Sequence, residues 1–229
     1  MLFAISDLHL SLGAEKPMND IFANWQGYVE KLRYNWLNLV KSDDTVVIVG
    51  DISWAINLEE SLKDFLFLDS LPGEKIIIKG NHDYWWTSLK KNNDFLASNN
   101  INSIKFLQNC SIEAQNFCIC GTRGWNFNSR LPHDIKITER EIDRLKLSIK
   151  HAEKSKLEKV VFMHYPPLYK NNISKFVDIF LENKIRRCYY GHIHVNNFVK
   201  SKLLVDNYMG VKFTLVSCDY LDFRPKYLN

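Results

Sequence analysis

The sequence lacks the features that mark membrane and secreted proteins. No apolar run approaches the ~20 residues that a helix needs to cross a bilayer. No low-complexity tract, internal repeat or Pro/Ser-rich linker interrupts the 229 residues. The opening stretch MLFAISDLHL has neither the basic segment nor the cleavage site of a secretory signal, and it predicts a first strand instead. We therefore expect a cytoplasmic protein without membrane association, folded as a single domain over residues 1–229.

Neither the cysteines nor the charged residues define a function by themselves. The cysteines are few, and the charged residues are scattered. The five cysteines are odd in number, and Cys118 and Cys120 lack the two-residue spacing of zinc-binding pairs, so buried free thiols are expected. Lys and Arg number 30 against 26 Asp and Glu, which gives a net charge of +4. The charges form no basic cluster of the kind that binds nucleic acid. The mildly basic balance suits a small anionic substrate.

Short apolar runs alternate with helical periodicity along most of the chain. Strands are predicted at 2–5, 45–50, 75–80, 103–107, 110–114, 117–121, 159–163 and 185–191, and a closing β-meander at 196–201, 202–208 and 212–218. Helices are predicted at 19–40, 58–68, 86–96, 138–154 and 174–183, the fourth beginning at a capping box formed by Thr138 and Glu141. This order predicts an α/β fold with a mixed sheet or two packed sheets.

Side chains that can bind metals follow five of the predicted strands, where function gathers in α/β sheets. They are Asp7, His9, Asp51, Asn81, His82, His164, His192 and His194. Each group taken alone fits an ordinary surface turn better than a metal site. Five unrelated turns, however, would not be expected to share the same ligand chemistry. We therefore expect these side chains to meet at one metal centre.

The donor types restrict which metal such a centre would hold. Carboxylate, imidazole and amide oxygen together suit borderline divalent ions such as Mn, Fe, Zn, Co or Ni. No thiolate is present, so a structural zinc cage is excluded. The imidazoles also exclude the all-oxygen coordination that calcium prefers.

These blocks together resemble the calcineurin-like metallophosphoesterase superfamily. The resemblance is carried, in order, by Asp7-x-His9, Gly50-Asp51, Gly80-Asn81-His82-Asp83, His164 and Gly191-His192-x-His194. It spans residues 7 to 194, which is most of the chain. The resemblance implies a four-layer αββα sandwich of two mixed β-sheets flanked by helices. It also implies a dinuclear centre of two divalent metal ions at the strand ends.

The resemblance further implies a role for each ligand. One ion would be held by Asp7, His9 and His194, and the other by Asn81, His164 and His192, with Asp51 bridging the two. Two divalent ions bring four positive charges, whereas Asp7 and Asp51 bring only two negative ones. The centre would stay positive and attract an anion such as a phosphate ester.

The expected function is hydrolysis of a phosphomonoester or phosphodiester by a metal-activated hydroxide, on a small metabolite or a nucleotide-like substrate. His82 is the expected general acid, and Asp83 is expected to support its imidazole. Trp54 and Trp85 are candidates for a wall on which a substrate ring stacks, although core packing explains a tryptophan equally well. Arg123, in a loop at 121–134 that could cap the site, is a candidate phosphate contact.

Three other functions fit these residues less well. The protein Ser/Thr phosphatase branch carries an Asp-Arg pair shortly after its Gly-Asp, and Trp54-Ala55 stands there in this chain, which argues against that branch. A nuclease is an alternative, but without a basic groove a nucleic-acid partner is possible and not favoured. A non-catalytic interaction scaffold is less favoured still, because no ligand is eroded and His82 is present. No obligate protein partner is evident.

Overall fold

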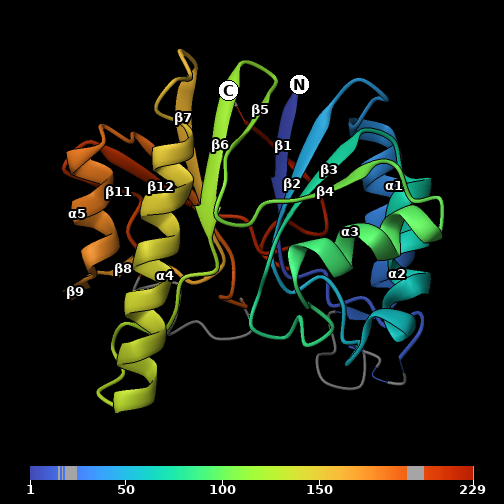
Figure 1. Cartoon of the computed structure of the whole chain (residues 1–229). Helices are drawn as coiled ribbons and strands as arrows, with labels where there is room; N and C mark the ends of the chain where they lie inside the picture. The colour runs from blue at the N-terminus through green and yellow to red at the C-terminus, as the bar shows by residue number, and fades with distance from the viewer. Residues whose placement is uncertain (15, 17, 19–24, 195–203, 229) are drawn as a thin grey trace.

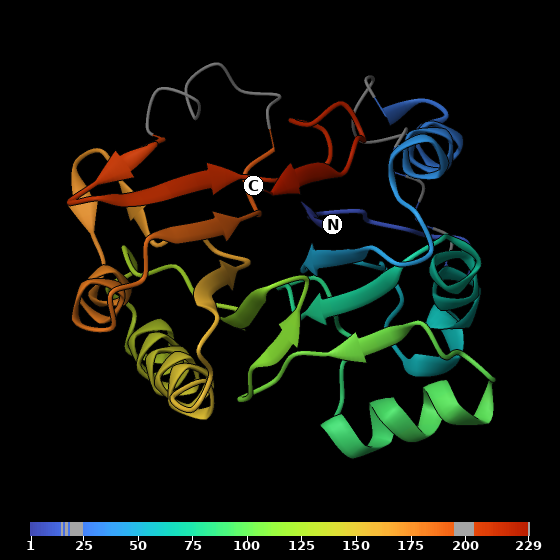
Figure 2. The ribbon, with the colours of Figure 1, turned by 90° about the horizontal axis from the view of Figure 1, so that it is seen from above.

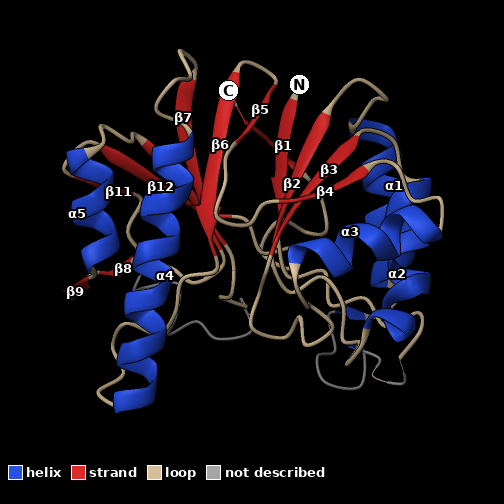
Figure 3. Ribbon diagram, in the orientation of Figure 1, coloured by secondary structure: helices blue, strands red, loops and turns tan. Residues whose placement is uncertain are grey.

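Two large mixed β-sheets and five α-helices build the part of the chain that the structure describes (Figures 1 and 3). The structure is a computed structural model, and it describes residues 1–14, 16, 18, 25–194 and 204–228. The first sheet has the order β13 (Lys226–Leu228), β1 (Leu2–Ile5), β2 (Thr45–Val49), β3 (Glu74–Ile78), β4 (Ile104–Phe106). The second has the order β11 (Asn207–Tyr208), β12 (Val211–Leu215), β10 (Arg187–Tyr190), β7 (Glu158–Met163), β6 (Phe117–Thr122), β5 (Ile112–Ala114). A small hairpin pairs β8 (Leu168–Tyr169) with β9 (Asn172–Ile173).

The helices lie on the outer faces of the two sheets, as the view from above shows (Figure 2). Three helices cover the first sheet: α1 (Tyr28–Leu39), α2 (Leu58–Ser70) and α3 (Leu89–Ser98). Two cover the second sheet: α4 (Pro132–His151) and α5 (Lys175–Glu182). The predicted four-layer αββα sandwich of mixed sheets is thereby confirmed.

Four layers require three hydrophobic cores, and the alternation of side chains along each strand supplies them. In β1, Phe3 and Ile5 pack into the core beneath the helices of the first sheet. Leu2 and Ala4 point the other way, into a core between the two sheets that also contains Phe162 of β7. A third core joins the second sheet to α4 and α5. Strands buried on both faces explain why these runs are continuously apolar in sequence.

The parallel pairing of the central strands brings their carboxyl ends to one edge. β1, β2, β3 and β4 run parallel, and so do β6, β7, β10 and β12. The loops that follow these strands gather below the sheets in Figure 1. Five strands that end in polar side chains therefore deliver them to the same place.

Three predicted helix starts are wrong, two of them those of α1 and α4. The helix expected at 19–40 begins only at Tyr28, after Gly27 adopts a left-handed conformation with φ 62°; residues 19–24 lie outside the described residues. The helix expected from a Thr138 capping box begins at Pro132, so Thr138 lies within it and donates to the Asp134 carbonyl at 2.9 Å. Glu141 faces inward and is 1% exposed, so its side chain makes tertiary contacts instead of forming the predicted capping box.

The predicted closing β-meander is also wrong in the part that the structure describes. β12 pairs in parallel with β10 and antiparallel only with the short β11. After β12 the chain crosses to the first sheet, where β13 pairs antiparallel with β1. The strand predicted at 196–201 lies outside the described residues.

The helix predicted at 86–96 starts at Leu89, after an N-cap at Ser88 whose side chain accepts from the Lys91 N–H.

Candidate metal centre

The turns that follow the strands have an unusual backbone. Four candidate ligands adopt positive φ: Asp7 (59°), His9 (45°), Asp51 (51°) and His192 (69°). This conformation is uncommon outside glycine and costs free energy, and such residues cluster at functional sites. Gly80 lets its backbone lie close to the Asp51 side chain, since a Cβ atom on residue 80 would lie 2.1 Å from Asp51 Oδ1. The backbone is thus shaped to bring side chains inward.

Asp7, His9 and His194 form the first donor group, with one ligand atom from each within 4.8 Å of the others. The Nε2 atoms of His9 and His194 face each other at 3.2 Å, and His194 Nε2 lies 3.9 Å from Asp7 Oδ1. Three donors from the ends of β1 and β10 thus converge on one point, although 185 residues separate His9 from His194.

Asp51, His164 and His192 form the second donor group, also within 4.8 Å. Asn81 joins it, because its Oδ1 lies 2.8 Å from His164 Nε2. Asp51 Oδ2 lies 3.3 Å from His164 Nε2 in this group and 3.8 Å from His9 Nε2 in the first. One carboxylate oxygen therefore faces both groups, as a bridging ligand must.

Neighbouring groups fix the orientation of the ligands. His164 Nδ1 lies 3.0 Å from the Val49 carbonyl, which leaves Nε2 to face the centre. His194 Nδ1 lies 3.2 Å from Asp219 Oδ2, and Ser217 donates to Asp7 Oδ2 at 2.8 Å. Such contacts select the tautomer and raise the basicity of a metal-binding imidazole. The sequence-based prediction missed Asp219, although it follows the carboxyl end of β12 and so carries the same signal that identified the other residues.

The ionisation of His9 and His192 fits metal binding, whereas His164 would have to give up a proton to a metal. Burial lowers the pKa of His9 to about 4 and that of His192 to about 3, so both imidazoles are neutral at neutral pH. Burial opposes the charged form of His164 too, but the Asp51 carboxylate beside it raises its pKa to about 9. Burial likewise disfavours ionised Asp51, yet the His164 charge holds its pKa below the ordinary value. The two groups thus supply imidazole nitrogens and carboxylate oxygens, a donor set that fits borderline divalent cations.

His82 lies beside the two groups. Its backbone N–H donates to Asp51 Oδ1 at 2.7 Å, so it positions the shared carboxylate. Its ring centroid lies 5.6 Å from that of His9 and 4.5 Å from that of Trp54. Burial lowers its pKa. Trp54, partly exposed, also stacks on His9 at 4.8 Å, so this tryptophan lies directly beside the donors.

Asp83 has a different position from the one expected. Its carboxylate accepts hydrogen bonds from the backbone N–H groups of Gly80 (2.7 Å), Asp51 (3.0 Å) and Ile52 (2.8 Å), and from Trp85 Nε1 (3.1 Å). None of these bonds reaches the His82 imidazole. Burial, and then the nearby Asp51 charge, raise the pKa of Asp83 to about 7. Asp83 therefore links the turns after β2 and β3. The expected contact between Asp83 and the His82 ring is not among these bonds, so that expectation is corrected.

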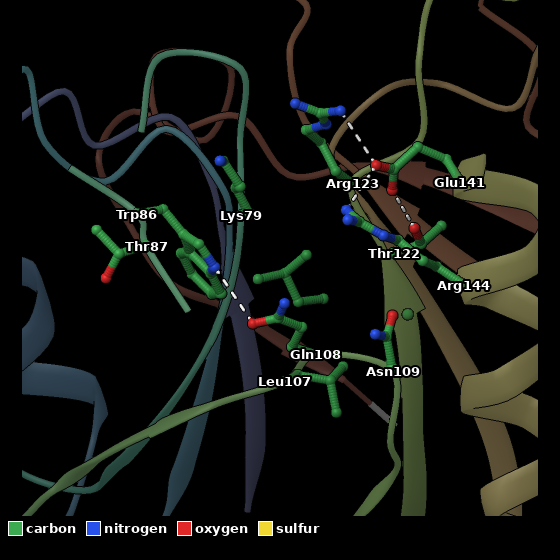
Figure 4. A pocket seen from close by; sticks show the side chains of 12 residues that line it. Lys79, Trp86, Thr87, Leu107, Gln108, Asn109, Thr122, Arg123, Glu141 and Arg144 are labelled. Carbon is green, nitrogen blue, oxygen red and sulfur yellow. Dashed lines mark hydrogen bonds and ion pairs between the residues drawn. The ribbon is translucent and has the colours of Figure 1, made fainter. Parts of the chain in front are cut away.

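The two other predicted substrate contacts lie away from the donors. Trp85 is 0% exposed and packs edge-to-face on Phe65 at 4.9 Å, so the predicted substrate contact is wrong and core packing accounts for this side chain. Arg123 pairs with Glu141 at 3.1 Å and lies 4.5 Å from the Trp125 ring. Arg123 lines a neighbouring cavity rather than the donor groups (Figure 4). The predicted loop at 121–134 is shorter than expected, because β6 extends to Thr122 and α4 begins at Pro132.

Two donor groups that share a carboxylate, at the strand ends of an αββα sandwich, define a site of the metal-dependent hydrolase type. The chain belongs to the calcineurin-like phosphoesterase family, whose model matches residues 2–196. The predicted resemblance is thus confirmed, and family membership together with the donor groups supports a metal-dependent phosphoesterase.

The individual proteins that resemble this chain are only distantly similar to it in sequence. A stretch of 83 residues is 34% identical to an uncharacterised protein of Methanocaldococcus jannaschii, covering 36% of this chain and 46% of that protein, less than half of its length. A protein of unknown function from Aquifex aeolicus has a similar structure, with a TM-score of 0.52 and 21% identity over 99% of this chain and 94% of the other. A phosphopantetheinyl hydrolase from Mycobacterium tuberculosis has a TM-score of 0.58 and 14% identity over 100% and 96% of the two chains. At such identities the structural likeness concerns the fold alone.

No described helix has the length and apolar character that crossing a membrane requires.

Proposed function

We propose that this protein hydrolyses phosphomonoesters or phosphodiesters of small metabolites or nucleotide-like compounds with the help of two divalent metal ions. The observation that carries the proposal is the position of Asp51 Oδ2, within 3.8 Å of His9 Nε2 and 3.3 Å of His164 Nε2. A carboxylate between two donor groups is the arrangement that holds two metals close together. Residues 1–229 would form one catalytic unit.

The ligands divide into two sets in this proposal. Asp7, His9 and His194 would hold one ion, Asn81, His164 and His192 would hold the other, and Asp51 would contact both. When bound, the ions stabilise charge on the phosphoryl oxygens and activate the water that attacks phosphorus. Their identity is left among Mn, Fe, Zn, Co and Ni, which share the preference for nitrogen and oxygen donors.

His82 protonates the leaving group in this proposal. Proton donation by a positioned side chain contributes about 10²- to 10⁴-fold in rate. The closeness of its ring to Trp54 and His9 supports the assignment. Asp83 contributes by positioning, since its hydrogen bonds from Gly80, Asp51 and Ile52 hold the turn that carries Asp51. It is therefore proposed as a positioning residue and not as a proton donor.

Trp54 is the proposed contact for the organic part of the substrate. It is partly exposed and stacks on His9, so a ring or chain bound at the metals would lie against it. Arg123 is proposed to contact an anionic group of the substrate at the neighbouring cavity. All five cysteines are free thiols, which suits the proposed cytoplasmic location.

The test is hydrolysis of p-nitrophenyl phosphate and of bis(p-nitrophenyl) phosphate by the full chain, assayed with each of the five metals. We expect activity that depends on metal, and the ratio of the two rates distinguishes a monoesterase from a diesterase. Asp51→Ala is expected to lose both metals and to fall to the background rate. Metal analysis that finds two ions retained by Asp51→Ala would refute the bridging role. Inactivity of the wild-type chain with every metal on both esters would refute the function.

A further inference from the structure

A cavity of about 110 Å³ lies between the two sheets (Figure 4). Its walls come from residues that follow β3 and β4, from the end of β6, and from one face of α4. The polar side chains that line it include Lys79, Gln108, Arg123, Glu141 and Arg144. In Figure 4, Lys79 stands on one wall, and Arg123, Arg144 and Glu141 stand on the facing one. None of these residues belongs to the two donor groups.

Glu141 organises the arginine wall. Its Oε1 accepts from Arg123 at 3.1 Å and from Arg144 at 2.9 Å, and its Oε2 accepts from Thr122 at 2.5 Å. The carboxylate is 1% exposed, so these bonds are shielded from water and hold both guanidinium groups in place. An arginine presents five N–H donors, and one shared carboxylate oxygen cannot satisfy two such groups.

The cavity therefore has donors and positive charge without matching acceptors. The Nε of Arg123 is buried and has no hydrogen-bond partner among the described residues. Within that same part of the chain, Lys79 makes no hydrogen bond or ion pair. Three cations and one carboxylate line the space, which leaves two positive charges uncompensated. Arg123 is largely buried, with a side chain that is 16% exposed, and a buried charge is costly unless an opposite charge accompanies it, whereas Lys79 and Arg144 are partly exposed.

The cavity is also structurally continuous with the metal centre. Lys79 precedes the candidate ligand Asn81 by two residues. The Arg123 carbonyl accepts from the Tyr165 N–H at 2.9 Å, and the Tyr165 ring lies 4.0 Å from that of His192. A ligand bound at the His164 and His192 side of the centre thus has the cationic cavity as its neighbour.

We propose that this cavity binds an oxyanion of the phosphate class and serves as a subsite for a second anionic group of the substrate. A cavity of about 110 Å³ has room for a phosphate group, and its arginine and lysine side chains suit an oxyanion better than an uncharged ring. The substrate class is then a phosphate ester that carries another phosphate or a carboxylate at a fixed distance. The subsite role rests on the proposed function, whereas the oxyanion binding does not.

The first experiment measures binding alone. Inorganic phosphate is titrated into the metal-loaded full chain by calorimetry, and into Lys79→Met and Arg144→Met. We expect the wild type to hold a phosphate site that each variant weakens about tenfold or more, separate from any phosphate at the metal centre, which both variants leave unchanged. Lys91→Met, which removes an exposed lysine from α3, is the matched control and should keep both sites. Isotherms of both variants that coincide with that of the wild type, or a wild type that binds no phosphate, would overturn the proposal.

The second experiment tests the substrate class with α,ω-alkanediol bisphosphates of increasing chain length and the corresponding monophosphates. Release of phosphate is followed for the wild type, Lys79→Met, Arg144→Met and Lys91→Met. We expect one chain length at which kcat/KM of the bisphosphate exceeds that of the monophosphate at least tenfold. The ratio should fall towards one in Lys79→Met and Arg144→Met and persist in Lys91→Met. A ratio near one at every length in the wild type would overturn the subsite.

The two failures can be told apart. If p-nitrophenyl phosphate and its bis ester are both stable in the presence of the protein, the proposed function fails, yet the calorimetric comparison still decides whether the cavity binds phosphate. If the esters are hydrolysed but the bisphosphate ratio stays near one, the subsite fails and the function stands.

Discussion

The metal centre and the cationic cavity lie side by side at the same edge of the sheets, and they obtain positive charge in opposite ways. The centre is lined by Asp7 and Asp51 and by imidazoles, so it depends on bound cations for a lasting positive charge. Under the proposed function, it would attract a phosphate ester only when those cations are bound. The cavity contains Arg123 and Arg144, so its positive charge belongs to the side chains themselves. One site is thus conditionally positive, and the other permanently so.

This difference separates affinity from chemistry. A permanently cationic cavity can bind an anion without bringing it to reaction, because it offers no nucleophile. A metal centre supplies the chemistry but holds substrate only in the loaded protein. If both act on one substrate, the cavity orients the molecule and the centre cleaves it, so changes in the two regions should have different signatures.

Removing the metals should produce the largest contrast between the two regions. Chelation with excess EDTA is expected to reduce hydrolysis of p-nitrophenyl phosphate to background, and added Mn²⁺ or Fe²⁺ should restore it. The cavity should still bind inorganic phosphate after chelation, because its charge comes from side chains. Calorimetry and rates on the same sample check this. Loss of all phosphate binding with the metals would remove the contrast.

His82→Ala tests chemistry within the metal centre. Both metals should remain bound, while kcat on an alkyl phosphate falls about 10²- to 10⁴-fold, because an alkoxide leaves slowly without a proton. The loss should be smaller on p-nitrophenyl phosphate, whose leaving group needs no proton. Metal analysis and rates on both esters measure the effect. His133→Ala, at a side chain that is 79% exposed, is the control, and full activity of His82→Ala on the alkyl ester would refute the role.

Asp219→Asn is expected to weaken the first donor group alone. It removes the carboxylate that lies 3.2 Å from His194 Nδ1, and such changes cost about 10- to 100-fold in metal affinity. The measurement is the Mn²⁺ concentration needed for half-maximal activity. The surface variant Asp222→Asn should match the wild type. An unchanged metal requirement in Asp219→Asn would show that His194 does not depend on this carboxylate.

Glu141→Gln should have the smallest effect of these changes. It should alter the stability of the fold rather than the rate of hydrolysis. The change leaves two arginines without their shared carboxylate, which we expect to lower the free energy of unfolding by about 1–3 kcal/mol. Urea unfolding of the variant and of Glu139→Gln, an exposed residue of the same helix, measures the difference. Equal midpoints would mean that Glu141 does not organise the arginine wall.

The amino-acid pattern predicts well whatever depends on strand position. Parallel strands end at one edge of a sheet, so the strand ends predict that Asp7 and Asp51, after β1 and β2, lie at the same edge. The same rule applies to Asp219 after β12, but a lone aspartate in a turn is too common to stand out without a neighbouring histidine. The fold class follows from the alternation of strands and helices.

The amino-acid pattern predicts poorly whatever depends on the direction of a side chain within a turn. Asp51 and Asp83 both follow buried strands, but only Asp51 faces the donors, because backbone N–H groups from separate turns capture the Asp83 carboxylate. Trp54 and Trp85 likewise look alike in sequence, whereas one stacks on His9 and the other is enclosed by the core. In both pairs the outcome is decided by contacts between segments that are distant along the chain.

The left-handed backbone at Asp7, His9, Asp51 and His192 has a consequence for the lifetime of the protein. Each such residue costs on the order of 1 kcal/mol or more, so the turns around the centre are less stable than the sheets that carry them. Bound cations would offset this cost by linking β1, β2, β7 and β10 through their ligands. A cell that runs short of metal would then lose more than turnover: these turns would open first, and proteases would gain their entry at the edge where catalysis is proposed to occur.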